Sequence, residues 1–166
     1  TTKPHITHFT TPMATGNPED LVVEFEVSDI THNSVKVTTI PSVGVYYFTY
    51  YVEKEYFDLL IDDYYSVDAR VAYIANSEID YGAEWFDCSR AEYLYDLGAS
   101  LGREKNFYNQ LEPSTDYIAY AIAVDIQSGE LASDKGFVSD VFRTLDKVVS
   151  DAAVSIEFGN YYDGSA

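Results

Sequence analysis

The segment Tyr117–Ile126 limits the fold more than any other part of the chain, because apolar side chains occupy nearly every position in it. Alternate residues of an extended chain point to opposite faces. One face of this strand would carry Tyr117, Ala119, Ala121 and Ala123, and the other Ile118, Tyr120, Ile122 and Val124. A strand with two apolar faces has to be covered on both sides. We therefore expect a central strand, with a sandwich core on one side and helices on the other.

Three runs upstream also predict strands. Residues 21–28 alternate apolar with acidic or polar side chains, which is typical of a half-solvated strand. A turn at 31–34 leads to Val35–Ile40, so the two runs together predict a hairpin. The third run, Val45–Val52, is aromatic on both faces, and another element must cover its outer face. The sequence is thus that of a mainly β protein.

Between residues 53 and 102 the apolar period changes from 2 to 3.6, which predicts two or three short amphipathic helices. Ser66 is placed to cap one of them. We interpret this stretch as a helical insertion that covers the apolar strands. Strand character returns at Asn106–Asn109, and a last strand follows the turn at 127–130 and ends at Thr144.

The chain divides into three parts. Residues 1–20, rich in Thr and Pro, predict an extended lead-in with a turn, and residues 21–145 form one sandwich with the insertion at 53–102. Residues 146–166 predict a linker and the first strand of a following domain, at Val154–Phe158. Because the first residue is Thr1, we also expect a leader or anchor upstream.

The charge of the chain restricts its partners. With 28 acidic and 10 basic residues, the net charge is -18, which repels a phosphate backbone or an anionic membrane and excludes nucleic acid as a partner. Basic ligands, divalent cations and neutral glycans stay compatible with it. The single cysteine, Cys88, cannot form an internal disulfide or a thiolate zinc site, and we expect it to be a buried small hydrophobic residue.

The residues Leu111-Glu112-Pro113-Ser114-Thr115-Asp116-Tyr117 resemble the L-x-P-x-T-x-Y signature of fibronectin type III domains. In that family the tyrosine opens the penultimate strand and its hydroxyl bonds back to upstream backbone, in a tyrosine corner. The resemblance covers about two-thirds of the chain and gives Leu111, Pro113 and Tyr117 structural roles. The insertion resembles a variant in secreted lipoproteins of Bacteroidetes bacteria, which implies an extracellular or outer-membrane location and a lipid anchor upstream. The fold itself implies no activity.

No motif for catalysis, a metal or a cofactor stands out. His5, His8 and His32 fall in the lead-in and a turn, so we expect solvent-exposed side chains without a function. Asp62, Asp63 and Asp68 could in principle hold Ca²⁺, but an EF-hand loop needs glycine and glutamate at positions where they are absent, and helix capping by Ser66 and Asp68 is favoured. There is no G-x-S-x-G motif and no glycine-rich phosphate loop.

The inserted region is rich in aromatic residues, most of which must pack helices onto the sheet. We take four of them as candidate binding residues, because exposed flat rings contact sugars and anchor protein partners: Tyr64, Tyr65, Tyr81 and Trp85. The sequence favours a non-catalytic recognition, adhesion or spacer module of a surface lipoprotein, with a protein or glycan partner. Two alternatives stay open: an accessory domain of a secreted peptidase or glycan-degrading enzyme, and a hydrolase that uses carboxylates near Trp85.

Overall fold

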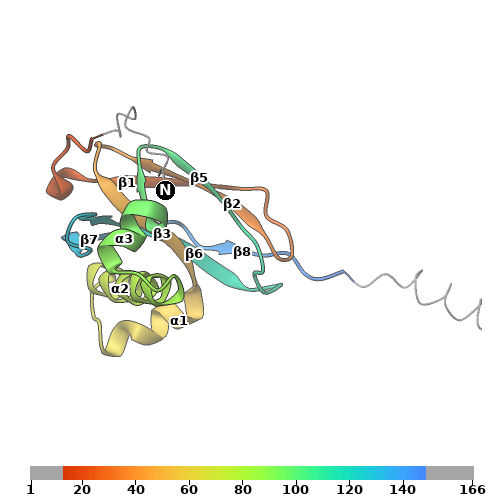
Figure 1. Ribbon diagram of the computed structural model, residues 1–166. Helices are drawn as coiled ribbons and strands as arrows, with labels where there is room; N and C mark the ends of the chain where they lie inside the picture. The colour runs from red at the N-terminus through yellow and green to blue at the C-terminus, as the bar shows by residue number, and fades with distance from the viewer. Residues whose placement is uncertain (1–12, 149–166) are drawn as a thin grey trace, which may run out of the picture.

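The computed structural model describes residues 13–148 and is mainly β, with two antiparallel sheets and a layer of helices (Figure 1). The first sheet has the order β1-β2-β5, and the second the order β4-β3-β6-β7, with β8 paired to β6. The strands are β1 (Val23–Ser28), β2 (Val35–Pro41), β3 (Tyr46–Glu53), β4 (Ala99–Leu101), β5 (Glu104–Tyr108), β6 (Asp116–Val124), β7 (Leu131–Val138) and β8 (Phe142–Arg143). The hairpin of β1 and β2 and the central place of β6 agree with the sequence pattern.

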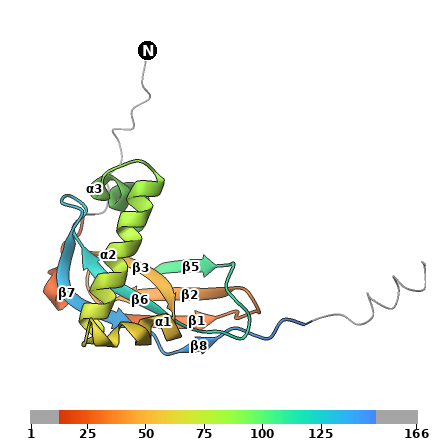
Figure 2. The same ribbon diagram turned by 90° about the horizontal axis from the view of Figure 1, so that it is seen from below.

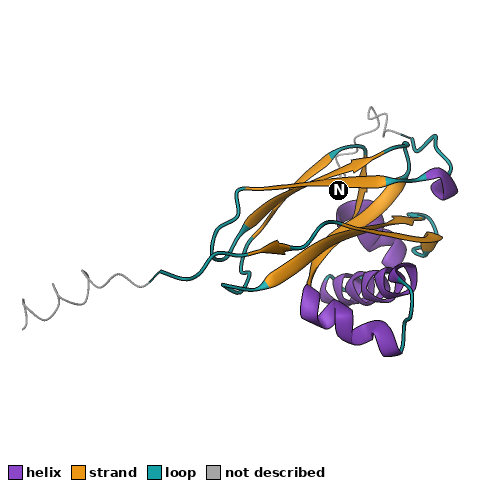
Figure 3. Cartoon of the chain, turned by 180° about the vertical axis from the view of Figure 1, so that it is seen from behind, coloured by secondary structure: helices purple, strands orange, loops and turns teal. Residues whose placement is uncertain are grey.

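The helices lie between β3 and β4 in the chain and cover the outer face of the second sheet, as Figures 2 and 3 show. They are α1 (Lys54–Leu59), the 3-10 turn η2 (Leu60–Asp62), α2 (Val67–Trp85), α3 (Arg90–Tyr93) and the π-helical turn η3 (Leu94–Gly98); a further 3-10 turn, η1 (Pro18–Asp20), precedes β1. The predicted cap is confirmed, because the Ser66 hydroxyl accepts the Ala69 N–H at 3.0 Å. None of the described helices is long and apolar enough to cross a membrane.

Strand β6 is buried on both faces, as its composition requires. The face toward α2 joins a core that contains Phe48, Val71, Ile74, Ile79, Leu94, Ile118, Tyr120, Ile122 and Val124. The face toward the first sheet carries the small alanines, which leave room for larger partners such as Tyr47 and Leu21. Thus the alternation of residues along one strand separates the sandwich core from the helix core.

Helix α2 lies in direct contact with β7. An added Cβ on Gly136 would come within 2.4 Å of the Val71 Cβ, so only a glycine lets the helix approach so closely. The Gly136 N–H donates to the Asp68 carboxylate at 2.8 Å, which gives Asp68 a structural partner. Arg90 of α3 donates to the Gly129 carbonyl, in the turn after β6, at 2.8 Å and to the side chain of Asn76, in the middle of α2, at 2.6 Å. These bonds fix the insertion on the sheet.

Some sequence expectations were wrong in detail. The last strand is divided into β7 and β8, because the Ser139 hydroxyl accepts the Ala119 N–H at 2.9 Å and interrupts regular pairing. Residues 99–101 form β4, although we expected the helical insertion to extend to 102. Cys88 is only partly buried, in the loop after α2. The predicted strand at 154–158 and most of the lead-in lie outside the described residues.

Candidate functional site

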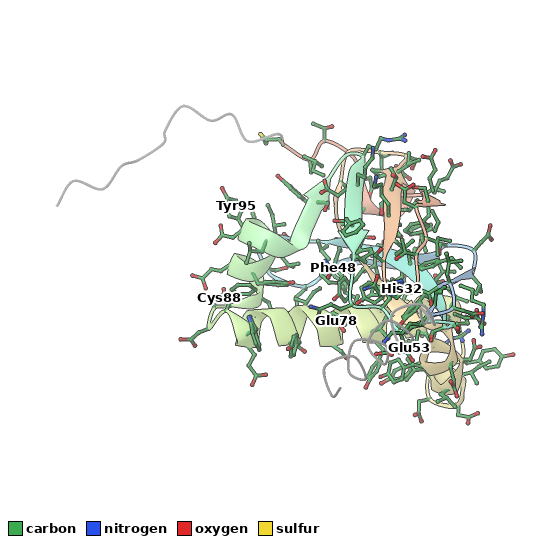
Figure 4. The ribbon with its side chains drawn as sticks, turned by 90° about the vertical axis from the view of Figure 1, so that its right-hand side faces the viewer. His32, Phe48, Glu53, Glu78, Cys88 and Tyr95 are labelled. Atoms are coloured by element: carbon green, nitrogen blue, oxygen red, sulfur yellow. The ribbon has the colours of Figure 1, made fainter. Side chains whose placement is uncertain are left out.

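An open groove lies between α2 and the strands of the two sheets. It has a volume of about 600 Å³, and its lining includes Tyr50, Glu78, Tyr81, Trp85, Glu104 and Tyr108. A second hollow of about 600 Å³ continues along Tyr50–Glu53 and shares Tyr50, Glu78 and Tyr81 with the first. Figure 4 shows Glu78 on the side of α2 that faces the strands. We call the two hollows together the aromatic groove.

The shape of the groove follows from the pairing of β3. Strand β6 pairs with one edge of β3 from Tyr47 to Glu53, whereas β4 pairs with the other edge only from Tyr46 to Phe48. Beyond Phe48, no strand in the described part of the chain pairs with that second edge. The groove therefore contains a free strand edge of the kind that can pair with another extended chain.

Aromatic rings from three elements meet in the groove. Tyr81 and Trp85 lie on successive turns of α2 with their ring centroids 6.0 Å apart. The ring of Tyr50 on β3 packs edge to face on that of Tyr108 on β5, with the ring centroids 5.5 Å apart, and the centroids of Tyr50 and Tyr51 are 4.6 Å apart. The side chains of Tyr81 and Trp85 are 61% and 71% exposed, so neither packs the helix onto the sheet. Their rings are available to a ligand.

The groove carries negative charge without a positive partner. Glu78 and Glu104 line it, and no Lys, Arg or His is among the described residues that do so. Burial raises the pKa of Glu78 above its usual 4.5. The pKa values of Tyr93 and Tyr120 are also raised, mainly by burial and secondly by the negative charge of Glu78, so both side chains stay protonated. Tyr50, Tyr81, Tyr93 and Tyr108 line the groove together with Glu78.

Tyr120 of β6 belongs to the core between the second sheet and the helices. Its hydroxyl is buried and has no hydrogen-bond partner among the described residues. A buried hydroxyl without a partner costs about 1–3 kcal/mol, so we expect phenylalanine at this position to stabilise the fold.

The structure separates the four predicted binding residues. Tyr81 and Trp85 come together in the groove. Tyr64 instead stacks on Tyr73 with centroids 4.4 Å apart and packs against the helix core. Tyr65 is 88% exposed and does not line the groove. The structure therefore brings Tyr81 and Trp85 together at the groove, whereas the turn between η2 and α2 holds Tyr64 and Tyr65 away from it.

Sequence reasoning missed the polar residues of the groove. Glu78 shares a helical face with Tyr81 and Trp85, because residues at i, i+3 and i+7 align on one side of a helix. That spacing could have identified it. Glu104 and Tyr108 come from β5, which lies far from α2 in the sequence, and only the fold brings them there.

The structural residues of the fibronectin-like signature take clear places. The Tyr117 hydroxyl accepts the Glu112 N–H at 2.9 Å, and the Tyr117 ring lies 6.0 Å from that of Phe142. Leu111 is buried in the same cluster, and the Pro113 carbonyl accepts the Thr115 hydroxyl at 2.8 Å. These contacts fix the loop before β6.

The metal candidates show no ligand set. No group of three or more His, Cys, Asp or Glu side chains that could hold an ion occurs within residues 13–148. His32 is exposed in its turn, whereas His5 and His8 lie outside the described residues. Asp62 and Asp63 are exposed beside the cap of α2.

Another hollow, of about 590 Å³, lies beside the turn between β6 and β7. Its lining includes Met13, Ala14, Tyr95, Asp125 and Ile126. Met13 and Ala14, the first residues that the structure describes, form part of its lining, and we base no site on it.

Comparison with known proteins finds similar solved structures but no relative in sequence. The chain matches no family model, and no curated protein is similar to it in sequence. It is similar to a short and a long form of the sensor domain of the anti-sigma factor RsgI4 of Pseudobacteroides cellulosolvens. The short form is 10% identical, with a TM-score of 0.39, and the similarity covers 76% of this chain and 96% of that one. The long form is 9% identical, also with a TM-score of 0.39, and the coverage is 79% and 95%.

Proposed function

We propose that the fold is a fibronectin type III-like sandwich with a helical insertion between its third and fourth strands. The first, second and fifth strands share one sheet and the third, sixth and seventh share the other, which agrees with the division of strands in immunoglobulin-like sandwiches. The hydrogen bond from Glu112 to Tyr117 has the form of a tyrosine corner. Both features support the proposal independently of composition.

We further propose that the chain is a non-catalytic recognition module of a larger protein at a bacterial cell surface, held there by a lipid anchor outside this chain. The aromatic groove binds its partner. The observation that carries this proposal is the exposed pair Tyr81 and Trp85, placed at the groove on adjacent turns of α2. Large aromatic side chains are the commonest anchors of protein partners and also stack on sugars.

The exposed pair has no structural explanation. A core aromatic residue stabilises a fold by removing its surface from water, and these two rings leave most of their surface in water. A single exposed apolar residue would be ordinary, but two rings beside a groove of this size form a patch. Binding gives such a patch the buried surroundings that the isolated domain lacks.

The test is a binding screen of the whole chain against arrays of glycans and extracellular proteins. For a saturable partner, we expect Trp85→Ala to weaken binding by about 30-fold, the effect of losing an aromatic hot spot of about 2 kcal/mol. Tyr65→Ala is the matched control, because it removes an exposed aromatic ring outside the groove and should leave affinity unchanged. Equal losses in the two variants, or a complete absence of partners, would contradict the proposal.

A further inference from the structure

The charge of the groove indicates the chemistry of what it holds. Glu78 and Glu104 are acidic, no basic side chain lines the groove, and the chain carries a net charge of -18. A partly buried carboxylate loses free energy of hydration, and hydrogen bonds or an opposite charge are needed to compensate for that loss. None of the ion pairs between described residues includes Glu78. A positively charged ligand group therefore fits this position best.

The rings favour the same ligand group. The face of an aromatic ring carries partial negative charge and attracts ammonium and guanidinium ions, with Trp and Tyr the strongest. Trp85, Tyr81 and Tyr50 place such rings around Glu78. This combination of a carboxylate with several rings attracts a basic side chain and repels an acidic one.

The free edge of β3 indicates the form of the ligand. From Thr49 to Glu53 the edge turned away from β6 has no strand partner among the described residues, and the groove runs along it. An extended peptide can pair with such an edge through its main chain, while pockets beside the edge select its alternate side chains. At about 3.3 Å per residue, this edge accommodates about five residues of peptide.

We propose that the aromatic groove binds an extended peptide that adds a strand to β3 and places a Lys or Arg side chain between Glu78 and the rings of Tyr81 and Trp85. This inference rests on the proposed recognition function and names the class of partner. The peptide main chain supplies register along β3, and the basic side chain supplies selectivity. Glycans are the competing class, and the experiment separates the two.

The experiment uses the whole chain labelled with ¹⁵N and follows backbone amide and indole signals during titration. The probe is a capped heptapeptide of alternating Thr and Val with Lys at its centre. There are three control peptides. In the first, norleucine replaces the Lys, and in the second, Glu replaces it. The third keeps the Lys and carries N-methyl groups on alternate main-chain nitrogens. Tetramers of glucosamine and of N-acetylglucosamine serve as the sugar probes.

We expect the Lys peptide to shift the signals of Tyr50–Glu53 and the indole of Trp85. The norleucine peptide should bind about tenfold more weakly, and the Glu peptide more weakly still. N-methylation should abolish binding, because it removes the main-chain donors that pair with the edge. Glu78→Gln keeps the shape of the side chain and removes its charge, so the preference for Lys over norleucine should fall below about threefold.

Several results would overturn the inference. Equal affinity for the Lys and norleucine peptides would refute the cationic ligand, and full binding of the N-methylated peptide would refute strand addition. Binding of the glucosamine tetramer at Trp85 without binding of any peptide would refute the peptide while leaving the recognition proposal intact. If Glu78→Gln unfolds the chain, Trp85→Phe, which keeps a ring of smaller electron density, gives the same comparison of Lys with norleucine.

Discussion

Tyr117 and Tyr120 lie on the same strand, and replacing either by Phe removes one hydroxyl with opposite consequences for stability. The Tyr117 hydroxyl accepts the Glu112 N–H at 2.9 Å, so Tyr117→Phe breaks a hydrogen bond, at a cost of about 1 kcal/mol. The Tyr120 hydroxyl is buried without a partner among residues 13–148. Tyr120→Phe relieves a desolvation penalty of about 1–3 kcal/mol, reduced by the small void that the oxygen leaves.

We therefore expect Tyr117→Phe to lower the free energy of unfolding by about 1 kcal/mol and Tyr120→Phe to raise it by about 1 kcal/mol. For a domain of this size, the two melting temperatures should differ by roughly 6–10 °C. Urea unfolding followed by circular dichroism measures both free energies, and an unchanged dependence on urea shows that the unfolded states are alike. Loss of stability in both variants would refute the assignment of the Tyr120 hydroxyl as unpartnered.

Three further changes test the site and the helix layer. Glu78→Gln should stabilise the protein at pH 7 but not below pH 4.5. Burial raises the pKa of Glu78 in the folded protein, so the stability of the wild type falls as the pH rises from about 4.5 through the folded pKa. Unfolding curves at both pH values measure the difference. Trp85→Ala should change the free energy of unfolding by less than about 0.5 kcal/mol, because the ring is exposed; a loss above about 2 kcal/mol in urea would mean that it belongs to the core. Gly136→Ala should lower the free energy of unfolding by about 1–3 kcal/mol in the same assay, because the added Cβ would lie 2.4 Å from the Cβ of Val71. Gly44→Ala is the control and should be close to neutral, because the nearest atom to its added Cβ is 3.6 Å away. Equal effects of the two variants would contradict the close contact between Gly136 and Val71.

Much of the fold could be predicted because its signals are local. The two apolar faces of residues 117–124 required cover on both sides, and the structure provides the first sheet on one and α2 on the other. Ser66 was identifiable as a cap from its place before a helical period. The break at Ser139 was not, since it depends on a bond to Ala119 across the sheet.

The candidate site was only partly predictable, because part of it depends on contacts between residues that are distant in the sequence. Tyr81 and Trp85 were identified by residue type, and their shared helical face also marks Glu78. The free edge of β3 depends on where β4 stops pairing, which no local pattern reveals. Tyr64 and Tyr65 are neighbours in the sequence, yet one is stacked on Tyr73 and the other faces solvent.

Hydrogen exchange of the whole chain, with and without the strongest partner from the binding screen, tests most directly whether the aromatic groove is the recognition site. The backbone amides of Tyr50–Glu53 and of the last two turns of α2 should exchange more slowly when the partner is bound, because binding covers the groove and orders the free edge. Protection confined to the hollow beside the turn between β6 and β7, with the groove unchanged, would contradict the account.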